Sequence, residues 1–116
     1  MSQTEASRSE PEWLNLLRSR KKLDRERGLS QLKAVLDTEF LEEGEKSKLE
    51  SCIFDLLSSL TAPWEEKHGG LMAAGILVPT ASERFCDLVK GEIPLLLEHQ
   101  ESRIRLASGE FGLLKG

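Results

Sequence analysis

Residues that favour β-strands are scarce in this chain. It has no Tyr, four Phe and two Trp among 116 residues, although 39% of the residues are hydrophobic and 31% are charged. Leu, Glu, Ala, Ser, Lys and Arg dominate, and the straight-chain residues among them keep their rotamer freedom in a helix. Aromatic and β-branched residues, by contrast, favour strands. The composition therefore predicts an all-α fold, and the length corresponds to a single domain.

The chain also has few residues that could form a disulfide or a metal site. Its two cysteines, Cys52 and Cys86, form no CxxC motif, and no motif spacing joins them to His68 or His99. Zinc sites need Cys and His ligands at characteristic spacings. We therefore expect no metal and no cofactor. The cysteine usage and the lack of a signal-peptide pattern predict a reduced compartment, the cytoplasm or the nucleus.

No long hydrophobic run is present either. The longest nearly uncharged run, Gly69 to Ser82, contains glycines and Pro79 and is too short to cross a bilayer. A net charge of −4 is unlike the basic balance of a nucleic-acid-binding domain. One basic segment, residues 18–27, leaves two interpretations open: a solvated helix end, or a contact with anionic lipid or nucleic acid. Its candidate contact residues are Arg18, Arg20, Lys21 and Lys22.

Catalytic motifs are missing as well. The triplet His68-Gly69-Gly70 could form an oxyanion loop like that of α/β-hydrolases, but the Gly-x-Ser-x-Gly turn that such enzymes need does not occur. The acid pairs Glu42-Glu43 and Glu65-Glu66 fall in predicted loops or first helical turns, where they complement a helix dipole. We therefore expect no catalytic residue and no enzymatic activity.

Hydrophobic periodicity predicts six helices. The third is the clearest, because its apolar residues follow helical spacing: Leu49, Cys52, Ile53, Leu56, Leu57 and Leu60. The fifth, which Thr80 or Ser82 caps, carries Phe85, Leu88, Val89, Ile93, Leu96 and Leu97. The remaining helices are expected at about 10–19, 24–38, 61–78 and 102–114.

Particular residues predict where these helices begin and end. Ser9 and Thr61 occupy capping positions. Gly44 can adopt the left-handed conformation that ends a helix. Pro94 interrupts the fifth helical pattern, so we expect a kink or a break near residues 91–93.

The helices fall into three predicted hairpins, at about 9–43, 45–79 and 81–116, after a disordered tail at 1–8. Their second helices contain "ERGLSQLKAVL", "KHGGLMAAGIL" and "RIRLASGEFGLL", which align on Leu29, Leu71 and Leu106 at the spacing of a two-helix repeat. The middle segment is rich in small residues, namely Gly69, Gly70, Ala73, Ala74 and Gly75. Because a helical glycine costs up to about 1 kcal/mol relative to Ala, these residues predict close helix packing. His68 is expected at the edge of this helix, with a backbone or carboxylate partner.

Two stretches resemble the HEAT/armadillo family of α-solenoids. The order Ser102-x-Ile104-Arg105-x-Ala107 is similar to the Val-Arg-x-x-Ala pattern of that family, shortened by one position. Within residues 28–74, "SCIFDLLSSL" followed by "EEKHGGLMAA" resembles a segment of the N-terminal HEAT array of target-of-rapamycin kinases. The resemblance implies a right-handed stack of about three hairpins that acts as a protein-interaction scaffold or adaptor. The apolar residues of the final "FGLLKG" lead us to expect the N-terminal part, or a short isoform, of a longer HEAT-repeat regulator of a large complex. The third loop lacks the Asp of the family pattern, which leaves the repeat boundaries open.

Solenoids bind partners along the ridge of their second helices. The candidate ridge residues are polar positions outside the apolar stripes: Arg25, Gln31, Lys33, Glu66, Lys67, Arg103 and Glu110. Trp13 is predicted to cover one end of the core or to contact a partner, since exposed Trp is a favoured interface anchor. Trp64 is expected to pack at the turn of the second hairpin.

Overall fold

The structure is a computed structural model that describes residues 11–38 and 42–115, and within these ranges all the regular secondary structure is helical. The helices are α2 (Glu12–Leu17), α3 (Lys22–Thr38), α4 (Glu43–Ser58), α5 (Trp64–Leu77), α6 (Glu83–Leu96) and α7 (Ser102–Lys115). The predicted all-α class is confirmed. The predicted tail at 1–8 and the cap at Ser9 lie outside the described residues.

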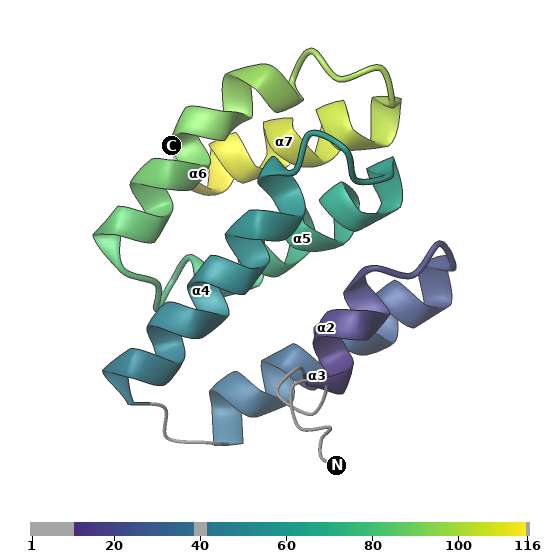
Figure 1. The fold of residues 1–116 in the computed structure, drawn as a ribbon. Helices are drawn as coiled ribbons and strands as arrows, with labels where there is room; N and C mark the ends of the chain where they lie inside the picture. The colour runs from purple at the N-terminus through teal and green to yellow at the C-terminus, as the bar shows by residue number, and fades with distance from the viewer. Residues whose placement is uncertain (1–10, 39–41, 116) are drawn as a thin grey trace.

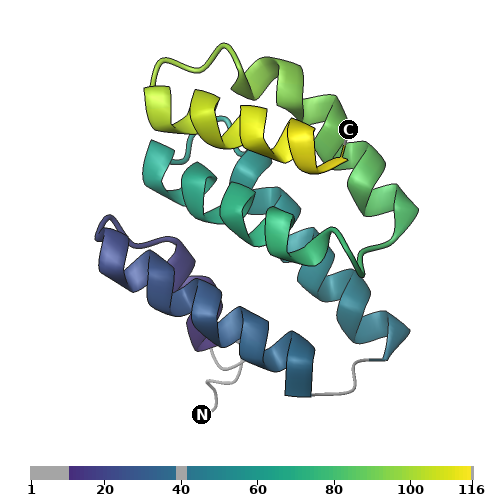
Figure 2. The ribbon, with the colours of Figure 1, turned by 180° about the vertical axis from the view of Figure 1, so that it is seen from behind.

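Each helix packs against its neighbour in the sequence, which gives the pairs α2 and α3, α4 and α5, and α6 and α7. The second helices α3, α5 and α7 lie in one row and begin at the same edge of the molecule (Figures 1 and 2). On the other side of the molecule, α4 contacts α6 (Figure 1). The molecule therefore has one face made by first helices and one made by second helices.

Aliphatic side chains from every helix meet between these faces. The completely buried ones include Leu14, Leu17, Leu32, Ile53, Leu57, Val89 and Ile104. Four leucines that the apolar patterns placed in the core are instead exposed: Leu60 by 93%, Leu88 by 41%, Leu97 by 44% and Leu106 by 64%. Leu60 is exposed because α4 ends at Ser58, before this residue.

Helix α4 begins earlier than expected because of a capping box that the sequence interpretation missed. The backbone N–H of Glu42 donates to Oε1 of Glu45 at 3.1 Å, and the Glu42 side chain accepts in return from the backbone of Glu45. Gly44 therefore lies in the first turn of α4, and its predicted role at the end of a helix is wrong.

The ends of α5 and α6 follow the predictions in part. Pro63, not Thr61, occupies the N-cap of α5, so the predicted cap is wrong. Ser82 caps α6 as expected, with its Oγ accepting from the backbone N–H of Phe85 at 3.2 Å. Pro94 lies inside α6, which continues to Leu96, so of the expected kink or break the break does not occur. The missing N–H of Pro94 removes one backbone hydrogen bond from the last turn of the helix.

Small residues bring the helix axes together at three points. A Cβ at Gly70 would lie 2.8 Å from the Leu56 Cβ, and one at Gly28 would lie 2.8 Å from the backbone oxygen of Trp13. A Cβ at Gly69 would overlap the backbone oxygen of Leu17. The predicted small-residue segment therefore faces two neighbouring helices; its Ala73 and Ala74 are fully buried, and Gly75 is half-buried.

The first and last helix–helix turns share one hydrogen-bond pattern. Nη1 of Arg25 donates to the backbone oxygens of Ser19 and Arg20, six and five positions earlier. Nη1 of Arg105 donates to the backbone oxygens at the same two offsets, those of residues 99 and 100. In both turns a side chain also accepts from the backbone N–H two residues later: Oγ of Ser19 from Lys21, and Nδ1 of His99 from Glu101.

Candidate functional site: a groove between the first helices

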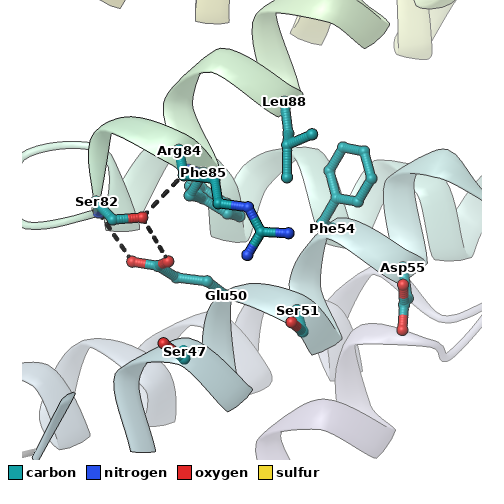
Figure 3. Close-up of a pocket in the computed structure, with 9 residues that line it drawn as sticks. All are labelled: Ser47, Glu50, Ser51, Phe54, Asp55, Ser82, Arg84, Phe85 and Leu88. Carbon is teal, nitrogen blue, oxygen red and sulfur yellow. Dashed lines mark hydrogen bonds between the residues drawn. The ribbon is translucent and has the colours of Figure 1, made fainter. Parts of the chain in front are cut away.

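A groove of about 500 Å³ lies between α4 and α6, on the face made by the first helices (Figure 3). Its lining residues on α4 are Ser47, Glu50, Ser51, Phe54 and Asp55, and on and before α6 they are Ser82, Arg84, Phe85 and Leu88. Glu50 and Ser82 lie at one end of the groove. Phe54, Leu88 and Asp55 lie toward the other end (Figure 3).

The polar end is held together by Glu50 and Ser82. Oε2 of Glu50 accepts from the backbone N–H of Ser82 at 2.9 Å, and Oε1 accepts from Oγ of Ser82 at 2.8 Å. The same Oγ accepts from the backbone N–H of Phe85 (Figure 3). Glu50 therefore fixes the start of α6 against α4 and complements the positive end of the α6 dipole.

The apolar end is formed by Phe54 and Leu88 above the buried ring of Phe85. The Phe54 side chain is half-buried and Leu88 is 41% exposed, whereas Phe85 is only 2% exposed. Large apolar side chains that remain accessible in a concave surface are typical of binding sites. This end of the groove can therefore accept an apolar side chain from another molecule.

Arg84 and Asp55 are the exposed charges of the groove. Within the part of the chain that the structure describes, neither side chain makes a hydrogen bond or an ion pair. The guanidinium of Arg84 extends into the space between Glu50 and Phe54 (Figure 3). Because no described residue bonds the Arg84 guanidinium, it is available to an anionic group from outside.

A second cluster lies on the opposite face, where α3, α5 and α7 begin. The guanidinium carbon of Arg103 lies 4.1 Å from the Trp64 ring centroid, and that of Arg25 lies 5.4 Å from it. The His68 ring meets the same indole edge-on at 6.1 Å. Trp64 therefore joins three helices through cation–π contacts.

Burial and the nearby positive charges of Arg25, Arg103 and Lys22 lower the pKa of His68, and the charge of Glu101 opposes them only in part. The predicted backbone or carboxylate partner of His68 is replaced by the Trp64 ring. The lowered pKa favours the neutral form of His68, and none of the acidic side chains in the described part of the chain forms a hydrogen bond or an ion pair with it.

Three residues predicted to contact a partner are buried. Arg25, Lys67 and Trp13 are 6%, 8% and 7% exposed, respectively. The Arg25 guanidinium is engaged by the first turn, and Nζ of Lys67 donates to the backbone oxygen of Leu57 at 3.4 Å. Burial also lowers the pKa of Lys67. Arg25 and Lys67 are therefore not exposed as the ridge assignment expected, whereas the burial of Trp13 agrees with the alternative that it covers the core.

The other predicted ridge residues do not form one site. Lys33 and Glu110 are exposed, and Gln31 is half-buried. Glu66 lies 4.0 Å from Arg18, and Arg103 donates to Glu101 at 2.8 Å. They are distributed over α3, α5 and α7, away from the groove. The groove itself was missed because Leu88 was assigned to the core stripe of its helix and Phe54 was given no role.

The basic segment at 18–27 carries several internal contacts. Lys22 lies 4.0 Å from Glu26, and Arg27 lies 3.8 Å from Asp24.

Among the described residues, no group of three or more His, Cys, Asp or Glu side chains could hold a metal ion, and no helix could span a membrane. No model of a known protein family, no curated protein and no solved structure matches the chain.

Proposed function

We propose that this chain is a protein-interaction module of the α-solenoid class, without enzymatic activity, and that it binds a partner through the groove between α4 and α6. The observation that carries the proposal is the accessible apolar pair Phe54 and Leu88 in that groove. An amphipathic helix placed in an apolar groove is a recurrent mode of peptide recognition.

The shared turn geometry supports the repeat architecture. Arg25 and Arg105 use the same nitrogen to bond backbone oxygens at the same offsets, although the sequences around the two turns differ. Tandem repeats are expected to bond the backbone carbonyl oxygens of their turns in the same way.

The middle pair of helices fits the same scheme with a different cation. Lys67 lies three residues before Gly70, as Arg25 lies three residues before Gly28, and each glycine packs against the preceding helix. Lys67 bonds the end of α4 where Arg25 bonds the first turn. This correspondence favours an alignment of the three second helices on Arg25, Lys67 and Arg105. It replaces the alignment on Leu29, Leu71 and Leu106.

The face made by the first helices is a better candidate for the binding surface than the predicted ridge of second helices. On the ridge side, Arg25 and Lys67 are buried and Arg103 is stacked on Trp64. On the groove side, apolar surface remains accessible next to unpaired charge among the described residues. The ion pairs within the basic segment give a lipid or nucleic-acid contact no comparable support.

Selection of peptide segments from a display library on the intact chain tests this function. The Leu88→Glu variant places a charge in the groove, and Leu95→Glu makes the same change at an exposed leucine of the same helix outside the groove. We expect the selected segments to bind the intact chain and Leu95→Glu equally well and to lose binding to Leu88→Glu. Segments that bind all three proteins alike would contradict a role for the groove.

A further inference from the structure

We propose that the groove recognises an amphipathic helical segment that carries an acidic side chain one turn away from a large apolar side chain. This inference rests on the proposed function and specifies the chemistry of the partner. In the complex, the acidic side chain pairs with Arg84 and the apolar side chain packs between Phe54 and Leu88.

The groove contains charged side chains. Arg84, Glu50 and Asp55 are its ionisable lining residues. Glu50 accepts two hydrogen bonds of 2.9 and 2.8 Å from Ser82 at the start of α6. Arg84 makes no such bond with any described residue and points into the groove (Figure 3). An incoming carboxylate therefore finds a guanidinium that can bind it with two parallel hydrogen bonds.

The spacing of the groove residues on α6 determines the spacing that a partner helix needs. Arg84 and Leu88 are four residues apart on α6, so they lie on one face of the helix with Cβ atoms about 5–6 Å apart. A partner helix meets both when its acidic and apolar side chains are also three or four residues apart. A segment with a cation at the acidic position would place like charges together, which disfavours binding.

The order of charges along the groove favours one direction of the partner helix. Asp55 follows Phe54 on α4 and lies beyond the apolar pair as seen from Arg84 (Figure 3). The groove thus has Arg84 and Glu50 on one side of its apolar surface and Asp55 on the other. A partner whose helix presents an acid, an apolar residue and then a base in that order matches the groove in one orientation.

The test uses Leu88-dependent segments selected on the intact chain. Their affinities are measured by fluorescence anisotropy for the intact chain, for Arg84→Glu, and for Lys90→Glu, which reverses a charge on α6 outside the groove. We expect Arg84→Glu to weaken binding at least about fivefold and Lys90→Glu to change it little. Replacing the acidic residue of the segment by Lys should reverse the preference, so that Arg84→Glu binds it more tightly than the intact chain does.

Arg84→Gln, which removes the charge without adding repulsion from Glu50, gives the same direction with a smaller effect and serves if Arg84→Glu does not fold. Leu88-dependent segments that bind the intact chain and both Arg84 variants equally would overturn the acidic-partner inference and leave the proposed function standing. If no selected segment depends on Leu88, both the inference and the proposed function are overturned.

Discussion

The backbone of Gly69 on α5 packs against the carbonyl oxygen of Leu17 at the end of α2, with no room for a Cβ between them. This contact joins the first helix pair to the second. Because backbone atoms lie on both sides, the overlap cannot be relieved by a side-chain rotation. The small-residue segment of α5 therefore determines how closely two helix pairs approach.

Gly69→Ala should destabilise the protein by roughly 1–3 kcal/mol, the usual cost of inserting a methyl group into a packed interface. Gly91→Ala is the matched control, since a Cβ at Gly91 meets nothing within 4 Å. The control should be neutral or stabilising by up to about 1 kcal/mol, because Ala favours the helix. Urea unfolding followed by circular dichroism measures both free energies. Equal effects of the two substitutions would contradict the close approach.

Arg25→Met should cost more stability than Arg105→Met, although both remove the same two hydrogen bonds to a turn. Arg25 is 6% exposed and also lies over Trp64, whereas Arg105 is exposed. Losing bonds from a buried charged donor costs about 1.5–3 kcal/mol, and losing them at an exposed site costs roughly 0.2–1 kcal/mol. Thermal unfolding of the two variants compares them directly. A larger loss for Arg105→Met would show that the turns are not held as described.

Stability should fall in mild acid because of His68. Its pKa in the folded protein is lowered, first by burial and then by Arg25, Arg103 and Lys22, so the unfolded chain binds a proton more readily than the folded one. The contribution of His68 is therefore complete above about pH 6.5 and is lost as the pH falls through the folded pKa. The free energy of unfolding, measured between pH 8 and pH 5, should decrease less steeply in His68→Gln.

His99→Gln provides the comparison, because it keeps His68 and its cationic neighbours. It should retain the fall in stability that His68→Gln reduces. If both variants follow the intact chain over this range, His68 is not held neutral by the cluster around Trp64.

Helix positions followed from the sequence, because helical periodicity and capping residues are local features. The apolar spacing in residues 49–57 predicted α4, and Ser82 predicted the start of α6. The errors also have local causes. The Glu42–Glu45 capping box uses an acidic residue at the N-cap in place of Ser or Thr, and it moved the start of α4 ahead of Gly44.

The candidate site was much less predictable, because it depends on which helices become neighbours. Charged residues such as Arg25 and Lys67 are usually exposed, yet their hydrogen bonds to carbonyl oxygens allow these two to be buried. Leu88 matches a core pattern, but it lines the groove between α4 and α6 and stays 41% exposed. A clue was present in α6, where Leu88 widens the apolar stripe beyond the face that Phe85 and Val89 occupy.

Binding in the groove can be followed by a nuclear magnetic resonance titration of the intact, isotope-labelled chain with a Leu88-dependent segment. We expect the backbone amide signals of residues 47–55 and 82–88 to shift together as the segment is added, while those around Trp64 and His68 stay in place. Shifts concentrated on α3, α5 and α7, with the α4 and α6 signals unchanged, would contradict the groove as the binding surface.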